Sequence, residues 1–138
     1  MSKSAVIYWS GTGNTKDMAK AIFTGMQDVG AETELFEVTS APNDLSVYEK
    51  IAFGCPSMGD EVLEESDFEP YFSAVEKQLY GKKIVLFGSY GWGDGEWMRN
   101  WVERVKSDGV QLMDKGFIEN EAPDKARCVE YGKKFADF

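Results

Sequence analysis

A short segment near the start of the chain carries a high density of hydrogen-bond donors. Residues 10–15 have the sequence Ser-Gly-Thr-Gly-Asn-Thr, in which hydroxyl and amide side chains surround two glycines. The segment follows an apolar run over 5–9 and precedes apolar residues at helical spacing, so it is predicted to join a strand to a helix. Backbone N–H groups at such a junction converge beside the positive end of the helix dipole. We therefore predict an anion site made of Ser10, Gly11, Thr12, Gly13, Asn14 and Thr15.

The glycine spacing narrows the kind of anion. A P-loop requires GxxxxGK[ST], and a dinucleotide fingerprint requires a third glycine where Lys16 stands. Neither motif is present, so a terminal phosphomonoester bound by neutral donors fits better than a pyrophosphate. The alternative is that residues 10–15 form only a tight turn with a helix N-cap.

Two later segments combine glycines with side chains that suit a flat ligand. Trp92 stands between two glycines in a polar segment, where its neighbours offer little surface for packing, and a flat ligand would supply that surface. Met58 lies in another such segment, and its flexible, polarizable side chain could cover the opposite face of the same ring. The alternatives are that Trp92 folds back on the core of its own domain and that Met58 is a core residue.

Composition excludes several other kinds of chemistry. The chain has no histidine, so a serine–histidine triad and a histidine-bound metal are excluded. Its two cysteines, Cys55 and Cys128, are far apart and form no CxxC pair, which excludes a four-thiolate zinc or iron–sulfur site within one chain. We predict neither a catalytic residue nor a metal ligand.

The charge and the apolar runs limit the partners and the location. The 24 acidic and 15 basic residues give a net charge of −9, which repels phosphate backbones and anionic lipids. Nucleic acid and membranes are therefore not expected partners. The first apolar run is too short for a secretory signal and no later run approaches membrane-spanning length, so we expect a cytoplasmic protein with reduced thiols.

The segments around these loops alternate between short apolar runs and stretches of helical period. A chain of 138 residues suits one domain, predicted over residues 1–138. Strands are predicted at 4–9, 32–38, 50–55, 83–87 and 110–118, with 32–38 at a half-exposed edge and the apolar run 83–87 in the centre. Helical spacing predicts apolar helix faces over 18–29, 68–79 and 97–105, and a last helix over 123–136 that has Pro123 in its first turn.

This alternation predicts an α/β fold, namely a three-layer, doubly wound, five-stranded parallel sheet with strand order 2-1-3-4-5. In such sheets the ligand lies beyond the carboxyl ends of the strands, at the point where the strand order reverses. The segments that follow the first, third and fourth strands would meet there. These are the three segments described above.

The three segments resemble the flavodoxins, and the resemblance extends over essentially the whole chain. The phosphate motif of that family, [ST]-x-T-G-x-T, is complete at residues 10–15. The segments 57–61 and 88–95 are similar to those of the short-chain, clostridial-type members, and residues 110–118 lack the insertion of the long-chain members. Many other flavodoxins carry Trp and Tyr in the two flavin loops where this chain has Met58 and Trp92, so their ring geometry is not transferred.

The resemblance implies one non-covalent FMN. It places Met58 and Trp92 on opposite faces of the flavin ring, turns the Gly59 carbonyl toward flavin N5 on one-electron reduction, and lets the Glu61 carboxylate accept from the ring N3–H. Besides residues 10–15, the implied cofactor-binding residues are Ser57, Met58, Gly59, Asp60, Glu61, Ser89, Tyr90, Gly91, Trp92, Gly93 and Asp94.

The resemblance also implies a function: a low-potential one-electron carrier, monomeric and not an enzyme, that shuttles between semiquinone and hydroquinone. The acidic stretch 60–69 would disfavour the anionic hydroquinone and would dock redox enzymes with basic surfaces, such as ferredoxin-type donors and acceptors. The alternative is that this stretch is only a solvated face. Rival interpretations of the whole chain are a quinone reductase on the same fold and a receiver domain, but the acidic positions of a receiver are occupied here by Ser10-Gly11 and Cys55-Pro56.

Overall fold

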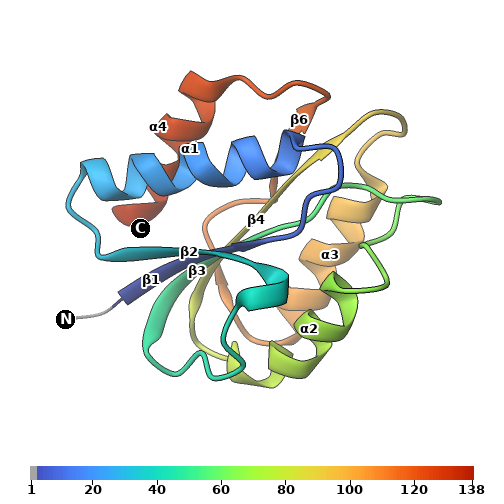
Figure 1. The fold of residues 1–138 in the computed structure, drawn as a ribbon. Coiled ribbons are helices and arrows are strands. Elements are labelled where there is room, and N and C mark those ends of the chain that lie inside the picture. The colour runs from blue at the N-terminus through green and yellow to red at the C-terminus, as the bar shows by residue number, and fades with distance from the viewer. Residues whose placement is uncertain (1–2) are drawn as a thin grey trace.

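A parallel sheet runs through the middle of the computed structural model, which describes residues 3–138 (Figure 1). Met1 and Ser2, the first residues of the predicted domain, lie outside the described residues. The strand order is β2-β1-β3-β4-β5, with β6 also paired to β4, so the predicted order 2-1-3-4-5 is confirmed. The strands are β1 (Lys3–Tyr8), β2 (Thr33–Glu37), β3 (Tyr48–Gly54), β4 (Lys83–Tyr90), β5 (Gln111–Leu112) and β6 (Phe117–Asn120).

Helices cover both faces of this sheet. Helices α1 (Asn14–Asp28) and α4 (Lys125–Ala136) lie on one face, and α2 (Phe68–Val75) and α3 (Glu96–Ser107) lie on the other (Figure 1). Each face has its own apolar core, one around Ile22 and Phe135 and one around Phe72 and Trp101. The predicted three-layer α/β architecture is therefore confirmed.

Strand β4 is longer than predicted and supplies part of the candidate site. The apolar run 83–87 was expected in the centre of the sheet. In the structure β4 is an inner strand, paired with β3 on one side and with β5 and β6 on the other, but β3 is the middle strand of the order. Pairing with β6 continues through Ser89 and Tyr90, which were predicted to be loop residues after a strand over 83–87. These two side chains therefore project from a rigid strand.

The prediction of one continuous fifth strand over 110–118 is wrong. The segment forms two short strands, β5 and β6, both parallel to β4 and separated by a polar turn. In this turn Gly116 has a φ of 101° and its N–H donates to Asp114 Oδ1 over 3.0 Å. The Tyr131 hydroxyl donates to the same oxygen, also over 3.0 Å, so the Asp114 carboxylate holds the chain away from the β4 ladder.

Several predicted helix boundaries also differ from the structure, including that of α2, which ends at Val75 rather than near residue 79. Helix α4 begins at Lys125 rather than within a first turn containing Pro123, because the Asp124 side chain caps it by accepting from the Arg127 N–H over 3.2 Å. Val29, predicted on the apolar face of the first helix, is 53% exposed because α1 ends at Asp28.

Glycines allow α1 and α4 to pack with their backbones in close contact. A Cβ added to Gly132 would lie 2.1 Å from the carbonyl oxygen of Ile22, and one added to Gly25 would lie 2.0 Å from that of Val129. Backbone atoms cannot move away as cheaply as a flexible side chain. The contact between these helices therefore requires glycine at both positions.

We expect Gly132→Ala to destabilise the protein by about 1–3 kcal/mol through overpacking. Helix propensity alone would make alanine more favourable than glycine by roughly 1 kcal/mol, so a loss of stability would have to come from the close packing of the two helices. Urea unfolding checks this result, with Gln27→Ala on the exposed side of α1 as a control that should change stability by less than about 0.5 kcal/mol. A Gly132→Ala variant as stable as the parent would contradict the close contact.

Candidate functional site

The segment between β1 and α1 has the geometry of an anion site. Gly13 occupies the N-cap position of α1 with a φ of 106°, and its N–H donates to Ser10 Oγ over 3.1 Å, which closes the loop on itself. Within residues 3–138, the backbone N–H groups of Thr12, Asn14 and Thr15 have no hydrogen-bond acceptor. These free donors at the positive end of a 15-residue helix fit a phosphate group.

A buried pair of hydroxyls joins this loop to the end of β4. Thr15 is 1% exposed, and its Oγ1 lies 2.8 Å from Ser89 Oγ and accepts the Ser89 N–H over 3.3 Å. The Thr15 hydroxyl was predicted to be a donor to the anion, but here it is engaged with Ser89. Its role in this structure is to fix the distance between the first and third loops.

The second loop is a tight hairpin. Met58 and Val62 form an antiparallel bridge with two N–H···O bonds of 2.9 Å, and Ser57 donates its N–H to the Ser89 carbonyl over 3.1 Å. The bridge encloses Gly59, which has a φ of 50° and open space around its α-carbon. A residue with a side chain would be strained in this left-handed conformation, whereas glycine adopts it readily.

Glu61 links the second loop to the third. It is 8% exposed, and its Oε1 accepts the N–H groups of Gly95 and Glu96, over 3.2 and 3.1 Å, at the start of α3. A Cβ on Gly93 would lie 2.5 Å from this carboxylate. The predicted partner of Glu61 was a ligand N–H, and the structure adds a role in holding the helix N-terminus.

The aromatic side chains of the third loop lie in different surroundings. Trp92 is 63% exposed, so the alternative that it folds back on the core is wrong. Tyr90 is half-buried and packs against the buried Trp97, with ring centroids 5.8 Å apart. Trp92 is thus available to cover a ligand, whereas Tyr90 is already positioned by the protein.

The three loops meet in a cleft of about 240 Å³ at the carboxyl ends of β1, β3 and β4. The predicted site residues that line it are Gly11, Thr12, Asn14, Ser57, Met58, Ser89, Tyr90 and Gly91. The other predicted residues stand around the cleft without lining it: Ser10, Gly13, Thr15, Gly59, Asp60, Glu61, Trp92, Gly93 and Asp94.

Three residues that line the cleft, Trp9, Pro56 and Glu121, are not among the predicted site residues. Trp9 follows β1, and its ring lies so close to Gly11 that a Cβ there would be 3.0 Å away. Glu121 follows β6 with a φ of 54° and donates its N–H to the Tyr90 carbonyl over 2.8 Å. The positions of Trp9 and Glu121 could have been used to predict them, because each residue directly follows a parallel strand, and these strands end at the same edge of the sheet.

The acidic stretch 60–69 divides into structural and exposed carboxylates. Glu64 is 7% exposed and accepts three backbone N–H groups, those of Ser66, Asp67 and Phe68, each over 2.8 Å. Burial alone would raise the pKa of Glu64, but these hydrogen bonds outweigh burial and hold it below its ordinary value. Glu64 therefore anchors the start of α2 and does not contribute to an exposed acidic surface.

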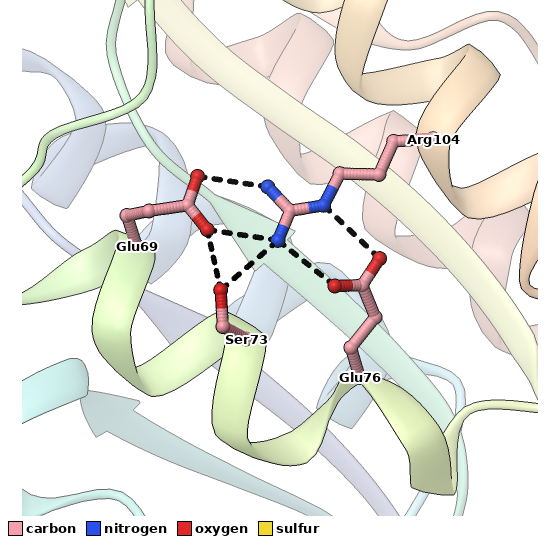
Figure 2. Close-up of polar contacts among 4 residues, drawn as sticks. All are labelled: Glu69, Ser73, Glu76 and Arg104. Carbon is pink, nitrogen blue, oxygen red and sulfur yellow. Dashed lines mark hydrogen bonds and ion pairs between the residues drawn. The ribbon is translucent and has the colours of Figure 1, made fainter.

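Arg104 of α3 pairs with two more acidic residues, Glu69 and Glu76 (Figure 2). Its guanidinium forms a bidentate pair with Glu69, both bonds 2.8 Å, and contacts both carboxylate oxygens of Glu76 over 3.0 and 2.8 Å. These hydrogen bonds, those from Arg104 foremost, lower the pKa of Glu69. Within 60–69, the exposed carboxylates are those of Asp60, Glu65 and Asp67.

Both cysteines are buried and unpaired, one in each core. Burial raises the pKa of Cys55 well above its ordinary value and that of Cys128 to about 12, so neither thiol is poised for reaction. In residues 3–138 there is no group of three potential metal ligands. Over the same residues, no helix combines the length and apolar character needed to cross a bilayer.

A doubly wound parallel sheet with a free-donor loop after β1 and a cleft at its carboxyl edge defines a mononucleotide-binding α/β protein. The flavodoxin family model matches residues 6–132. The chain is 44% identical to the flavodoxin of Clostridium beijerinckii over 135 residues, covering 96% of this chain and 98% of that protein. It is also 44% identical to the flavodoxin of Megasphaera elsdenii over 134 residues, covering 95% and 96%.

Comparison with solved structures also finds flavodoxins similar to this chain. The solution structure of two-electron reduced Megasphaera elsdenii flavodoxin superimposes with a TM-score of 0.89 at 41% identity, covering 98% of this chain and 99% of that one. A flavodoxin from the domain Archaea gives a TM-score of 0.88 at 26% identity, with coverage of 98% and 96%. The chain belongs to the flavodoxin family, as a short-chain, clostridial-type member. It is accordingly an FMN-binding electron-transfer protein rather than an enzyme.

We expect Glu64→Gln to destabilise the protein by about 1–3 kcal/mol at pH 7, because an amide accepts less strongly than a carboxylate from the three backbone N–H groups. Since the pKa of Glu64 is lowered on folding, its charge-dependent contribution is full above the ordinary carboxyl pKa of about 4.3 and is lost as the pH falls through the folded value. Urea unfolding between pH 7 and pH 3 should therefore show the difference from the parent shrinking with acid. The exposed neighbour variant Glu65→Gln should lack this effect. An equal loss at every pH would contradict the assignment.

Proposed function

We propose that residues 1–138 form one domain that binds a single non-covalent FMN in the cleft. The phosphate would lie on the loop after β1, held by the backbone of Thr12, Asn14 and Thr15. Met58 and Trp92 would cover the two faces of the flavin ring. The proposed cofactor-binding residues are Ser10, Gly11, Thr12, Gly13, Asn14, Thr15, Ser57, Met58, Gly59, Asp60, Glu61, Ser89, Tyr90, Gly91, Trp92, Gly93 and Asp94.

The observation that carries this proposal is the set of free N–H groups at the cleft. Thr12 and Asn14 line the cleft, and their backbone donors have no acceptor within residues 3–138. A bound phosphate would accept hydrogen bonds from these donors, which the fold leaves open at the start of α1. The cleft volume of about 240 Å³ is below the range of about 300–1,000 Å³ typical of small-molecule sites, so part of the ring would stay exposed. An exposed ring edge is what electron exchange with another protein requires.

FMN, when bound, supplies the capacity to take up and release single electrons. The contribution of the chain is to hold the ring and to offer a hydrogen-bond acceptor beside it. The peptide between Gly59 and Asp60 lies in the hairpin closed by the bridge of Met58 and Val62, and Gly59 can change its backbone conformation without a side chain in the way. The carbonyl of this peptide would accept a hydrogen bond from the N–H at flavin N5 when that nitrogen is protonated.

The exposed acidic residues near the hairpin would make this a low-potential carrier. A negative charge about 10 Å from another one costs about 0.4 kcal/mol in water and about 1.7 kcal/mol at an effective dielectric constant of 20. Asp60, Glu65 and Asp67 are exposed and form no ion pair within residues 3–138. Adding negative charge to the ring is therefore disfavoured, whereas Glu69 contributes less because Arg104 neutralises it.

The same three carboxylates are the proposed docking surface for redox enzymes with basic surfaces, including ferredoxin-type donors and acceptors. Surface charge of this kind steers encounter more than it adds affinity. We propose a monomer, since a single chain supplies all three loops of the cleft. A cytoplasmic location is proposed because both cysteines are free thiols.

The visible spectrum of the purified protein during stepwise reduction tests the function. We expect yellow protein that releases one FMN per chain on denaturation and accepts electrons in two resolved steps. Trp92→Ala should weaken FMN binding about tenfold or more and reduce the quenching of flavin fluorescence, because the exposed indole would be buried against the ring. Tyr80→Ala is the matched control, since Tyr80 is also an exposed aromatic residue, 80% accessible, but it precedes β4 and belongs to none of the three loops of the site. Protein that stays colourless and takes up no FMN would overturn the proposal.

Electron transfer to a basic cytochrome c at different salt concentrations tests the docking surface. The double variant Glu65→Gln, Asp67→Asn should slow transfer several-fold at low ionic strength and have little effect once the Debye length falls to about 3 Å near 1 M salt. The control Asp28→Asn, Glu130→Gln removes the same charge from the α1 and α4 face and should leave the rate nearly unchanged. Equal effects of the two double variants would show that only net charge matters.

A further inference from the structure

Three carboxyl groups lie around one arginine where α3 meets α2 and the short 3-10 helix that follows it, η2 (Glu76–Gln78). The Arg104 guanidinium lies between the carboxylates of Glu69 and Glu76 (Figure 2). The third carboxyl group belongs to Asp108, the C-cap residue of α3, whose side chain forms a hydrogen bond with that of Glu76. One positive charge therefore faces three acidic groups.

The hydrogen bond between Asp108 and Glu76 requires a proton on one of the two carboxyl groups. An ionised carboxylate can only accept hydrogen bonds, so two ionised groups in contact would repel each other. Glu76 is held ionised, because its Oε2 accepts from Arg104 Nε over 3.0 Å and its Oε1 accepts from Arg104 Nη2 over 2.8 Å. Burial alone would raise the pKa of Glu76, but hydrogen bonds, those from Arg104 foremost, lower it. The proton therefore belongs to Asp108.

The surroundings of Asp108 also disfavour a negative charge there. Its Oδ2 is buried and meets no hydrogen-bond donor within residues 3–138, which is costly for an ionised oxygen. Asp108 stands at the C-terminal end of a 12-residue helix, where the helix dipole is itself negative. Burial, followed by the contact with Glu76, raises the pKa of Asp108 to about 6, and attraction to Arg104 offsets only part of this rise.

The other polar neighbours supply no counter-charge to Asp108. Lys106 forms its ion pair with Glu103 over 3.2 Å. Lys77 of η2 is exposed and forms no ion pair within the part of the chain that the structure describes. Tyr80, in the turn before β4, is a neutral neighbour that lies against the glycine after Asp108.

We propose that Asp108 and Glu76 share one proton and form, with Arg104, a pH-sensitive clamp between α3 and the end of α2. With the proton in place, the Asp108 hydroxyl donates to Glu76, which keeps both of its bonds from Arg104. When the proton is lost, two carboxylates face each other and the contact between the helices weakens. The inference does not depend on the proposed FMN site, since none of these residues lines the cleft.

The raised pKa of Asp108 fixes the direction of the pH effect. The folded chain binds this proton more tightly than the unfolded chain, in which the ordinary pKa of an aspartate is about 3.9. The contribution of Asp108 to stability is therefore full below about pH 4 and is lost as the pH rises through the folded value of about 6. Glu64 and Glu69, whose pKa values are lowered, act in the opposite direction and below the ordinary glutamate value of about 4.3. The range above about pH 4.5 thus isolates Asp108.

Urea unfolding of the purified protein between pH 4.5 and pH 7.5 tests the clamp. An amide in Asp108→Asn can donate to Glu76 at every pH, so the folding constant of this variant relative to the parent should be about threefold to tenfold larger at pH 7.5 than at pH 4.5. Asp137→Asn is the matched control, because Asp137 is the exposed C-cap residue of α4, and its ratio should change by less than about twofold. Equal pH dependence of the two variants would overturn the proposal.

Carboxyl-carbon NMR of the parent reports the proton directly. The Asp108 carbon should titrate with a midpoint near 6, and the Glu76 carbon should show a step at the same pH because the proton is shared. Glu76→Gln should lower the Asp108 midpoint by about one pH unit or more, since its amide can donate to the ionised aspartate. A parent midpoint near the ordinary value of about 3.9 would refute the clamp. An unchanged, raised midpoint in Glu76→Gln would refute the shared proton, since burial alone would then account for it.

Discussion

Parallel pairing of β1, β3 and β4 is the constraint on which the site depends. Because these strands run in the same direction, their carboxyl ends reach one edge of the sheet, and the loops that follow them must meet there. The chain winds from β1 outward to β2 and then back to β3 on the other side, so the first and second site loops diverge and leave a space between them. The cleft is thus a result of strand order, and the loop residues decide only what it binds.

Polar contacts between the loops then set its shape. The hydroxyl pair of Thr15 and Ser89 joins the first loop to β4, the N–H of Ser57 joins the second loop to the same strand, and Glu61 joins the second loop to α3. All of these contacts are made by the protein alone. Contacts of this kind tie the loops to one another and to the sheet, so that less ordering is required when a ligand binds.

The sequence predicts the architecture and the three loops well, because apolar periodicity and glycine-rich junctions are local signals. It fails where a tertiary contact decides the outcome. The Asp114 carboxylate accepts a hydrogen bond from Tyr131, 17 residues along the chain, where the fifth strand is interrupted. Glu64 becomes a buried helix anchor although the adjacent Glu65 is exposed. Arg104 is another example, since its pairing with Glu69 and Glu76 joins residues of two helices (Figure 2). Trp9 and Glu121 were missed for a different reason, as each lies just outside a segment with a recognisable motif.

The interruption between β5 and β6 has a consequence for how copies of this protein behave at high concentration. Unpaired strand edges can template the addition of another chain, and long, flat edges carry the greatest risk of aggregation. Here the edge beyond β4 consists of a two-residue strand and a four-residue strand with a polar turn between them. An edge interrupted in this way presents only short runs of backbone N–H and C=O groups to which a strand of another molecule could pair. The same turn that shortens the ladder thus helps to keep separate copies of the protein from pairing at this edge.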